Sequence, residues 1–113
     1  MDCVFCNIVA GRIPSKIVHQ DEEIIAFPDI HPLASTHILI IPKRHITSLV
    51  DLPKTDLPLI SRMVDVANRL AKQEGVSEKG YRLVINTGTE GGQIVPHLHM
   101  HLIGGRKLAD ELG

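Results

Sequence analysis

The segment His97-Leu98-His99-Met100-His101-Leu102 carries a histidine at every second position and an apolar residue between each pair. Successive side chains of a β-strand point to opposite faces, so this segment as a strand presents three imidazoles on one face. The apolar face is explained by burial in a core. The imidazole face is not, because ring nitrogens that are buried need hydrogen-bond partners. The alternation therefore predicts an amphipathic strand with a functional face.

Three explanations compete for the row of imidazoles. The histidines are ordinary surface or core residues, they form a three-histidine site for zinc or copper, or one of them attacks a substrate while its neighbours orient it. The loop before the strand favours catalysis. Gly91 and Gly92 allow backbone N–H groups to approach an anion closely, and Asn86 and Gln93 add amide donors at the two ends of the loop. Phosphoryl transfer is the chemistry that this combination predicts.

The rest of the chain predicts an α+β fold in a single domain over residues 1–113. Apolar residues spaced by three and four predict a long helix from about residue 55 to Gly75, and a short helix is expected over 5–9. Strands are expected at 17–19, 23–27, 37–41, 81–86 and 97–103. These five strands suggest a meandering, largely antiparallel sheet, in which the last two form a hairpin around the glycine-rich loop.

Charge and hydropathy exclude two classes of partner. The formal net charge is -1 and the basic residues do not gather in one patch, which argues against nucleic-acid binding. No apolar run approaches the length of a membrane span, and Met1-Asp2-Cys3 does not begin a secretory signal. We therefore expect a cytoplasmic protein without a membrane partner. In that reducing compartment the pair Cys3 and Cys6 is expected to bind a metal or to do redox chemistry.

The triad and several other segments together resemble the histidine-triad superfamily, and most closely its branch of nucleotide-binding phosphoramidases. The resemblance covers nearly the whole chain and rests on the triad and on residues 13–16, 26–30, 36–43, 81–86, 91–93 and 104–106. It implies a homodimer whose two sheets join into one. It also implies an enzyme that hydrolyses nucleoside 5'-phosphoramidates, usually of purines, through a covalent nucleotidyl-histidine intermediate.

The resemblance also implies a role for each histidine and for one acid. His99 attacks the α-phosphorus, His97 orients it, and His101 contacts phosphate oxygens. His37 lies in a hydrogen-bond chain behind the nucleophile. Asp29 accepts hydrogen bonds from the ribose hydroxyls; the alternative, given its position after Pro28, is that it is only a turn acid.

The remaining substrate contacts fall into two sets. The phosphate side of the site is expected to comprise Asn86, Gly92, Gln93 and Ile94. The apolar slot for the base is expected to comprise Phe5, Ile8, Phe27, Ile30 and Leu39. Ile8 and Leu39 are explained almost as well as plain core residues. His19 and His31 match no functional position and are expected at the surface. Nothing in the pattern selects adenine over guanine or names the leaving group.

This chain departs from the phosphoramidase pattern in three places. Ile94 stands where a serine that assists the leaving group is common, and Pro96 stands where a tyrosine is common. A Trp-Pro-Pro-Gly tail found in some relatives is absent after Arg106. These departures bear on catalytic efficiency and on the preference for the leaving group.

The cysteine pair resembles a zinc site of bacterial histidine-triad proteins. In that pattern Cys3, Cys6, His45 and His97 hold one structural zinc ion, which ties the N-terminal helix to the sheet. The alternative is two reduced thiols near a loose terminus.

Two rival functions remain beside phosphoramidate hydrolysis. One is hydrolysis of dinucleoside polyphosphates. The other is a purine-nucleotide-binding or scaffolding module whose hydrolytic activity is incidental.

Overall fold

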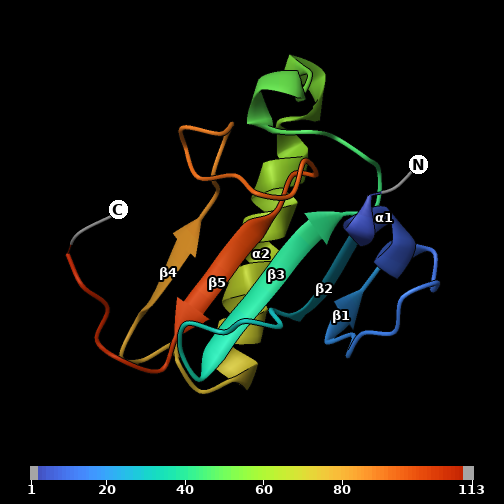
Figure 1. Cartoon of the computed structure of the whole chain (residues 1–113). Helices are drawn as coiled ribbons and strands as arrows, with labels where there is room; N and C mark the ends of the chain where they lie inside the picture. The colour runs from blue at the N-terminus through green and yellow to red at the C-terminus, as the bar shows by residue number, and fades with distance from the viewer. Residues whose placement is uncertain (1–2, 111–113) are drawn as a thin grey trace.

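A five-stranded sheet with a long helix on one face forms the frame of the molecule in the computed structural model, which describes residues 3–110 (Figure 1). The sheet order is β1-β2-β3-β5-β4, and every neighbouring pair is antiparallel. Its strands are β1 (His19–Gln20), β2 (Ile24–Pro28), β3 (Thr36–Pro42), β4 (Tyr81–Val84) and β5 (Met100–Gly104). The expected α+β layout is confirmed.

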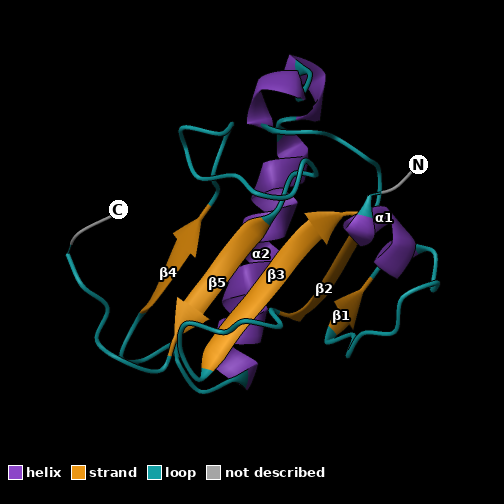
Figure 2. Ribbon diagram, viewed as in Figure 1, coloured by secondary structure: helices purple, strands orange, loops and turns teal. Residues whose placement is uncertain are grey.

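The helices lie on opposite faces of the sheet. The helix α2 (Pro58–Gln73) covers one face along β3 and β5, and the short α1 (Val4–Val9) lies against the other face (Figure 2). Two single turns of 3-10 helix, η1 (Leu49–Asp51) and η2 (Lys54–Asp56), lead into α2. Over residues 3–110 no helix combines the length and apolarity that a bilayer span requires.

The helix α2 forms because its apolar residues fall on one face. Its buried side chains are Leu59, Met63, Val66, Ala67, Leu70 and Ala71, at the spacing of an amphipathic helix. Pro58 occupies the first turn, where its missing N–H costs no hydrogen bond. Gly75 follows the helix with a φ of 76°, a conformation that glycine adopts without strain.

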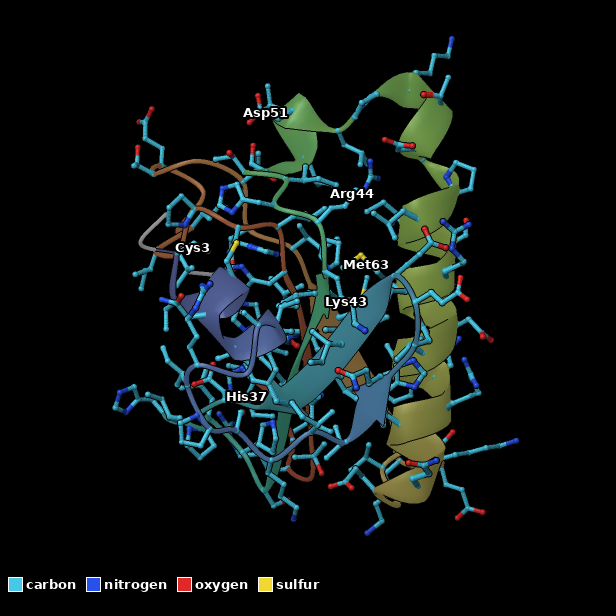
Figure 3. The ribbon with its side chains drawn as sticks, turned by 90° about the vertical axis from the view of Figure 1, so that its right-hand side faces the viewer. Cys3, His37, Lys43, Arg44, Asp51 and Met63 are labelled. Atoms are coloured by element: carbon cyan, nitrogen blue, oxygen red, sulfur yellow. The ribbon has the colours of Figure 1, made fainter. Side chains whose placement is uncertain are left out.

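The strand β3 is buried on both faces, which explains its unbroken apolar sequence. Ile38 and Ile40 belong to the core under α2, whereas Leu39 and Ile41 belong to a second apolar cluster on the α1 side. Figure 3 shows the same division: Cys3 and His37 lie on the α1 side, and Met63 points from α2 toward the sheet. The α1 side is where the histidines gather.

Three strands, β1, β4 and β5, have a boundary that differs from the sequence prediction by two or more residues. β5 begins at Met100, so His97 and His99 precede the strand instead of lying in it. The N–H of Leu98 donates to the carbonyl of Ile46, and Pro96 is the central residue of a tight turn in which the N–H of His97 donates to the carbonyl of Val95. These bonds take the place of ladder pairing in this segment.

The other two differences also follow from local hydrogen bonds. β4 ends at Val84, because Asn86 belongs to the glycine-rich loop, where its side chain bonds to Gly91. β1 is only His19–Gln20, because Asp21 caps the next turn by accepting the N–H groups of Glu23 and Ile24. The antiparallel pairing of β4 with β5 is as expected.

Candidate active site and metal centre

The three histidines of the triad lie side by side on the α1 side of the sheet. His97 and His99 are buried, and His101 is half-buried. The rings of His99 and His101 are 5.0 Å apart, centroid to centroid, and the ring of Phe5 meets both His97 and His99 edge-on. The intervening Leu98, Met100 and Leu102 lie in the core under α2. The histidines and the apolar residues therefore lie on opposite faces, as predicted from the sequence. This holds even at His97 and His99, which precede the paired part of β5.

The hydrogen bonds of His99 define which of its nitrogens carries the proton. Its Nδ1 lies 2.7 Å from the backbone carbonyl oxygen of His97. A carbonyl oxygen only accepts, so Nδ1 must carry a proton and donate it. In the neutral ring the lone pair then lies on Nε2. The neutral tautomer that this contact selects therefore has an unprotonated Nε2, the form required of a nucleophile.

The hydrogen bonds of His37 and His101 define their proton positions in the same way. The N–H of Leu33 donates to Nδ1 of His37 across 3.1 Å, so that nitrogen is the acceptor. Nε2 of His37 therefore carries the proton and donates it to Nδ1 of His101 across 2.9 Å. His101 in turn must carry its proton on Nε2. His37 thus lies behind His101, whose ring is the neighbour of His99.

Burial keeps both of these rings neutral. Desolvation, together with repulsion from His99 and His37, lowers the pKa of His101 to about 4, against the attraction of Asp29. Desolvation also lowers the pKa of His37, again opposed by Asp29, whose Oδ2 lies 3.4 Å from Nε2 of His37. At neutral pH both rings are therefore hydrogen-bonded neutral imidazoles.

A second group of ligating atoms lies beside the triad. Cys3 and Cys6 converge with His45 and His97, and their four ligand atoms lie within 4.8 Å of one another. The Sγ atoms of Cys3 and Cys6 lie 3.4 and 3.7 Å from Nδ1 of His97, and Sγ of Cys6 lies 3.2 Å from Nδ1 of His45. A tetrahedral zinc with usual bond lengths separates sulfur and nitrogen ligands by about 3.5 Å. The donor set and its spacing fit a metal ion, and both cysteines are free.

The backbone already orients His97 for a metal. Its Nε2 lies 2.8 Å from the carbonyl oxygen of Pro42, so Nε2 donates and the lone pair lies on Nδ1, toward the cysteines. A carbonyl that accepts from the second ring nitrogen is the usual orienting contact of a metal-bound histidine. The N-terminal cap of α1 brings the first thiol into place, since the N–H of Cys6 donates to Sγ of Cys3.

A third cluster, Asp29 with His37 and His101, also places three ligating atoms within 4.8 Å. Its ring nitrogens already take part in hydrogen bonds. Nδ1 of His37 accepts from the N–H of Leu33, and Nε2–H of His37 donates to Nδ1 of His101. Binding a metal there would require that proton to leave and the Leu33 contact to break. The described contacts therefore make this cluster a hydrogen-bond chain and not a metal site.

The glycine-rich loop differs from the anion-binding nest that the sequence suggested. The N–H groups of Gly91, Gly92 and Gln93 all donate to carbonyls within the loop, and the N–H of Gly88 donates to the side chain of Gln93. These amides are therefore not free donors in this structure. The loop is instead a self-bonded turn that glycine makes feasible, with a φ of 86° at Gly92.

The side chains of the loop attach it to the rest of the site. Nε2 of Gln93 donates to the carbonyls of Thr47 and Val95, and Nδ2 of Asn86 donates to Gly91. Asn86 keeps a carbonyl oxygen and a second N–H for other partners. Ile94, next to Gln93, is 91% exposed.

The predicted apolar slot is brought together in part. Phe5, Phe27 and Leu39 are buried in one cluster with Cys3, and Ile8 packs against its edge. The two phenylalanine rings meet edge-on with centroids 5.7 Å apart. Ile30 lies apart from them at the surface and is 86% exposed.

The remaining sequence predictions concern exposed or turn positions. Asp29 accepts the N–H of His31 through Oδ1, so it forms the expected turn, while Oδ2 faces His37. His31 is exposed, and His19 is half-buried in an ion pair with Asp21. Sequence reasoning missed the carbonyl of Pro42 and the N–H of Leu33. Both are backbone groups, so no residue type could have signalled them.

Comparison with known proteins places this arrangement in a family. A family model described as "Scavenger mRNA decapping enzyme C-term binding" matches residues 2–111. The purine nucleoside phosphoramidase of Escherichia coli (strain K12) is 48% identical over 111 residues, which cover 98% of this chain and 93% of the relative. The chain belongs to the histidine-triad family. The sequence prediction of that family is thereby confirmed.

Solved structures of histidine-triad proteins agree with this chain over its full length. A HIT family hydrolase from Legionella pneumophila superposes with a TM-score of 0.96 at 47% identity, covering 99% of this chain and all of that one. A histidine-triad protein from Clostridium difficile gives a TM-score of 0.95 at 43% identity, covering 98% of this chain and 96% of that one. The expectation of a histidine-triad hydrolase is therefore confirmed together with the fold.

Proposed function

We propose that this chain hydrolyses purine nucleoside 5'-phosphoramidates through a covalent intermediate on His99. The observation that carries the proposal is the fixed tautomer of His99, whose Nδ1–H donates to the His97 carbonyl and leaves Nε2 as a lone pair. His101, whose ring is the neighbour of His99, carries its proton on Nε2, because its Nδ1 accepts from His37. A nucleophile and a hydrogen-bond donor therefore stand side by side.

The reaction takes place in two displacements. Nε2 of His99 attacks the α-phosphorus, a phosphorus–nitrogen bond to the ring forms, and the bond to the substrate amine breaks. The departing amine takes one proton from solvent. Water then attacks the same phosphorus, so that a phosphorus–oxygen bond forms, the bond to His99 breaks, one proton returns to solvent and the nucleoside 5'-monophosphate is released. Nε2–H of His101 donates to a phosphate oxygen in both steps, where charge develops.

The nucleoside occupies the α1 side of the sheet in this proposal. Oδ2 of Asp29 accepts from the ribose hydroxyls, while Oδ1 keeps the turn that positions it. The base packs on the cluster of Phe5, Phe27 and Leu39, with Ile8 at its edge, while the exposed Ile30 lies apart from that cluster. Flat apolar contacts of this kind suit a purine ring and do not depend on the pattern of base-edge donors.

The phosphate side is formed by the loop before the triad. Asn86 contributes its free N–H to the phosphate, and Gly92 and Gln93 shape the loop through their internal bonds. Ile94 faces the leaving group. Because its side chain has no hydrogen-bonding atom, it offers the departing amine apolar contact only.

A structural zinc ion completes the proposal. Cys3, Cys6, His45 and His97 would hold it as a closed tetrahedron, which suits a structural role and leaves no open position for a substrate. Bound zinc would supply a rigid link between α1 and the triad. The free thiols that it requires are consistent with a cytoplasmic protein.

The active form in this proposal is a homodimer with a continuous sheet. β4 lies at one edge of the sheet and carries four residues, against two in β1 at the other edge, so β4 offers the longer row of unpaired backbone groups. Light scattering on the purified protein tests this, since a dimer has twice the mass of one chain and a monomer contradicts the pairing.

The decisive experiment is mass spectrometry of the protein quenched during turnover of an adenosine 5'-phosphoramidate. We expect one AMP on His99 in the wild type and none in His99→Ala, with His31→Ala as the matched control because His31 is exposed and outside the site. An adduct on another residue would refute the role of His99. Bound nucleotide with neither adduct nor hydrolysis would indicate the nucleotide-binding module instead.

A further inference from the structure

The turn that follows β5 presses against the loop between β2 and β3. Gly105 has a φ of 100°, and a Cβ atom on it would overlap the hydroxyl of Ser35. The next residue, Arg106, donates from Nε to the carbonyl oxygen of Leu33 across 2.9 Å. Two independent contacts therefore attach residues 105–106 to this loop, which begins at Asp29.

Leu33 is the point at which this attachment reaches the histidines. Its carbonyl accepts from Arg106, and its N–H donates to Nδ1 of His37. Within residues 3–110 these are the only hydrogen bonds recorded for Leu33, whose side chain is 62% exposed. The carbonyl bound by Arg106 and the N–H bound by His37 belong to the two peptide groups on either side of the Leu33 Cα atom, so the Arg106 contact reaches His37 through this one residue.

We infer that Arg106 is a positioning residue that sets the proton positions on His37 and His101 through the backbone of Leu33. This inference rests on the proposed function only for its catalytic consequence. A backbone N–H can only donate, so a Leu33 held in place requires an unprotonated Nδ1 on His37. The proton then lies on Nε2 of His37 and is donated to Nδ1 of His101. The proton of His101 therefore lies on its Nε2.

Asp29 supports the same arrangement from the other end of the loop. Its Oδ2 lies 3.4 Å from Nε2 of His37, and a negative charge there favours a proton on that nitrogen. Asp29 alone does not define the tautomer, because this distance is too long for a strong hydrogen bond. The N–H of Leu33 completes the selection of the His37 tautomer, because it requires a lone pair on Nδ1 of that ring.

Loss of Arg106 would free the backbone at Leu33, weaken the contact of its N–H with His37 and allow the other neutral tautomer of His37. His37 would then offer a lone pair to His101, and His101 would have to place its proton on Nδ1. A lone pair in place of a donor would face the phosphate oxygens. The loss of an oxyanion donor slows catalysis strongly, so a partial loss is expected to lower kcat about tenfold, with KM changed less than about twofold.

The test reads the tautomers directly by two-bond ¹H–¹⁵N correlation spectra of the histidine rings at pH 7, in the absence of nucleotide. In the wild type we expect protonated Nε2 and unprotonated Nδ1 on both His37 and His101. Arg106→Ala should show a mixture on these two rings, and Arg106→Lys should restore part of the wild-type pattern. His99 serves as an internal control, because its proton is fixed by the His97 carbonyl.

Arg69→Ala is the matched surface variant, since Arg69 pairs only with Asp65 on the exposed face of α2. It should leave every ring unchanged. Identical His37 and His101 signals in the wild type and in Arg106→Ala would overturn the inference, as would equal changes on all rings, which would indicate general destabilisation.

The spectra separate this inference from the proposed function. If Arg106→Ala alters the two tautomers but the wild type forms no adduct with a phosphoramidate, the linkage holds and the proposed reaction is wrong. If the adduct forms and the tautomers do not respond to Arg106, the reaction holds and the positioning role is wrong.

Discussion

Nδ1 of His99 donates to the backbone carbonyl of His97, and the side chain of His97 is itself held at both ring nitrogens. The proposed nucleophile is thus oriented by the main chain of a residue whose ring belongs to the proposed zinc site. Zinc bound there would stiffen the backbone that orients His99. The predictions below test the two sites and the connection between them.

His99→Ala should lower turnover of an adenosine phosphoramidate by at least about 10³-fold, because the covalent step has no other nucleophile. Binding of AMP, measured by calorimetry, should remain within a few fold, since the ribose and base contacts are untouched. His31→Ala should match the wild type in both assays. Retained activity in His99→Ala would contradict the covalent mechanism.

Asp29 can be tested by a pair of variants that separates its turn from its charge. Asp29→Asn keeps an oxygen that can accept the N–H of His31, whereas Asp29→Ala loses both the turn contact and the carboxylate. If Asp29 binds ribose, both variants should raise KM, by about tenfold for loss of a charged hydrogen bond. A 2',3'-dideoxy substrate should remove the difference from the wild type. An unchanged KM in Asp29→Asn would identify Asp29 as a turn residue.

Cys6→Ser should lower the zinc content below the one ion per chain expected of freshly purified protein. Because zinc binds the folded state, its loss should also reduce stability by about 2–3 kcal/mol, equivalent to a fall in Tm of roughly 10 °C or more. Elemental analysis and thermal unfolding report the two effects. His31→Ala is a suitable control, since the exposed side chain of His31 lies outside the cluster. A wild-type protein that contains no zinc and is not destabilised by Cys6→Ser would exclude the site.

Acid should destabilise the fold in a window set by His101. Its pKa is about 4 in the folded chain, because burial disfavours the imidazolium, and about 6.5 when unfolded. Between these values the unfolded chain binds more protons, so stability decreases as pH falls from about 6.5 to 4. Denaturant titrations at several pH values should show a shallower decrease in His101→Asn than in the wild type. Parallel curves would mean that His101 titrates normally.

Ile94→Ser should increase the rate for substrates with a strongly basic amine. The serine hydroxyl adds a hydrogen-bonding group at the leaving-group side, and a gain of about tenfold in kcat is in the range of one proton-transfer contact. Stability should not change, because the Ile94 side chain is 91% exposed. Equal rates for the two proteins would show that Ile94 does not face the leaving group.

Sequence patterns predicted the parts of the molecule that depend on side-chain identity. The spacing in α2 and the alternation around the triad placed the core correctly, because burial follows apolar periodicity. The pairing of Cys3 and Cys6 with two distant histidines came from resemblance, and the structure brings all four together. In each case the residue types and their spacing were sufficient to predict which side chains lie together.

The sequence did not predict the features that depend on backbone hydrogen bonds. The start of β5 depends on the turn at Pro96 and on a bond from Leu98 to Ile46, which no local pattern announces. The amides of the glycine-rich loop were expected to face an anion, but they bond among themselves. The tautomers of His37 and His97 depend on a peptide N–H and a carbonyl that only the fold brings near.

The strand β3 serves both ends of the histidine row. Its last residue, Pro42, accepts from His97, and its second residue, His37, donates to His101. The length of the strand therefore sets the distance between the proposed zinc site and the hydrogen bond of His37 with His101. Inserting or deleting one residue in β3 would shift the row against its two supports and reverse the faces of every side chain beyond the change. Length changes in this strand should thus disable both centres at once, whereas loops of similar size elsewhere can vary independently.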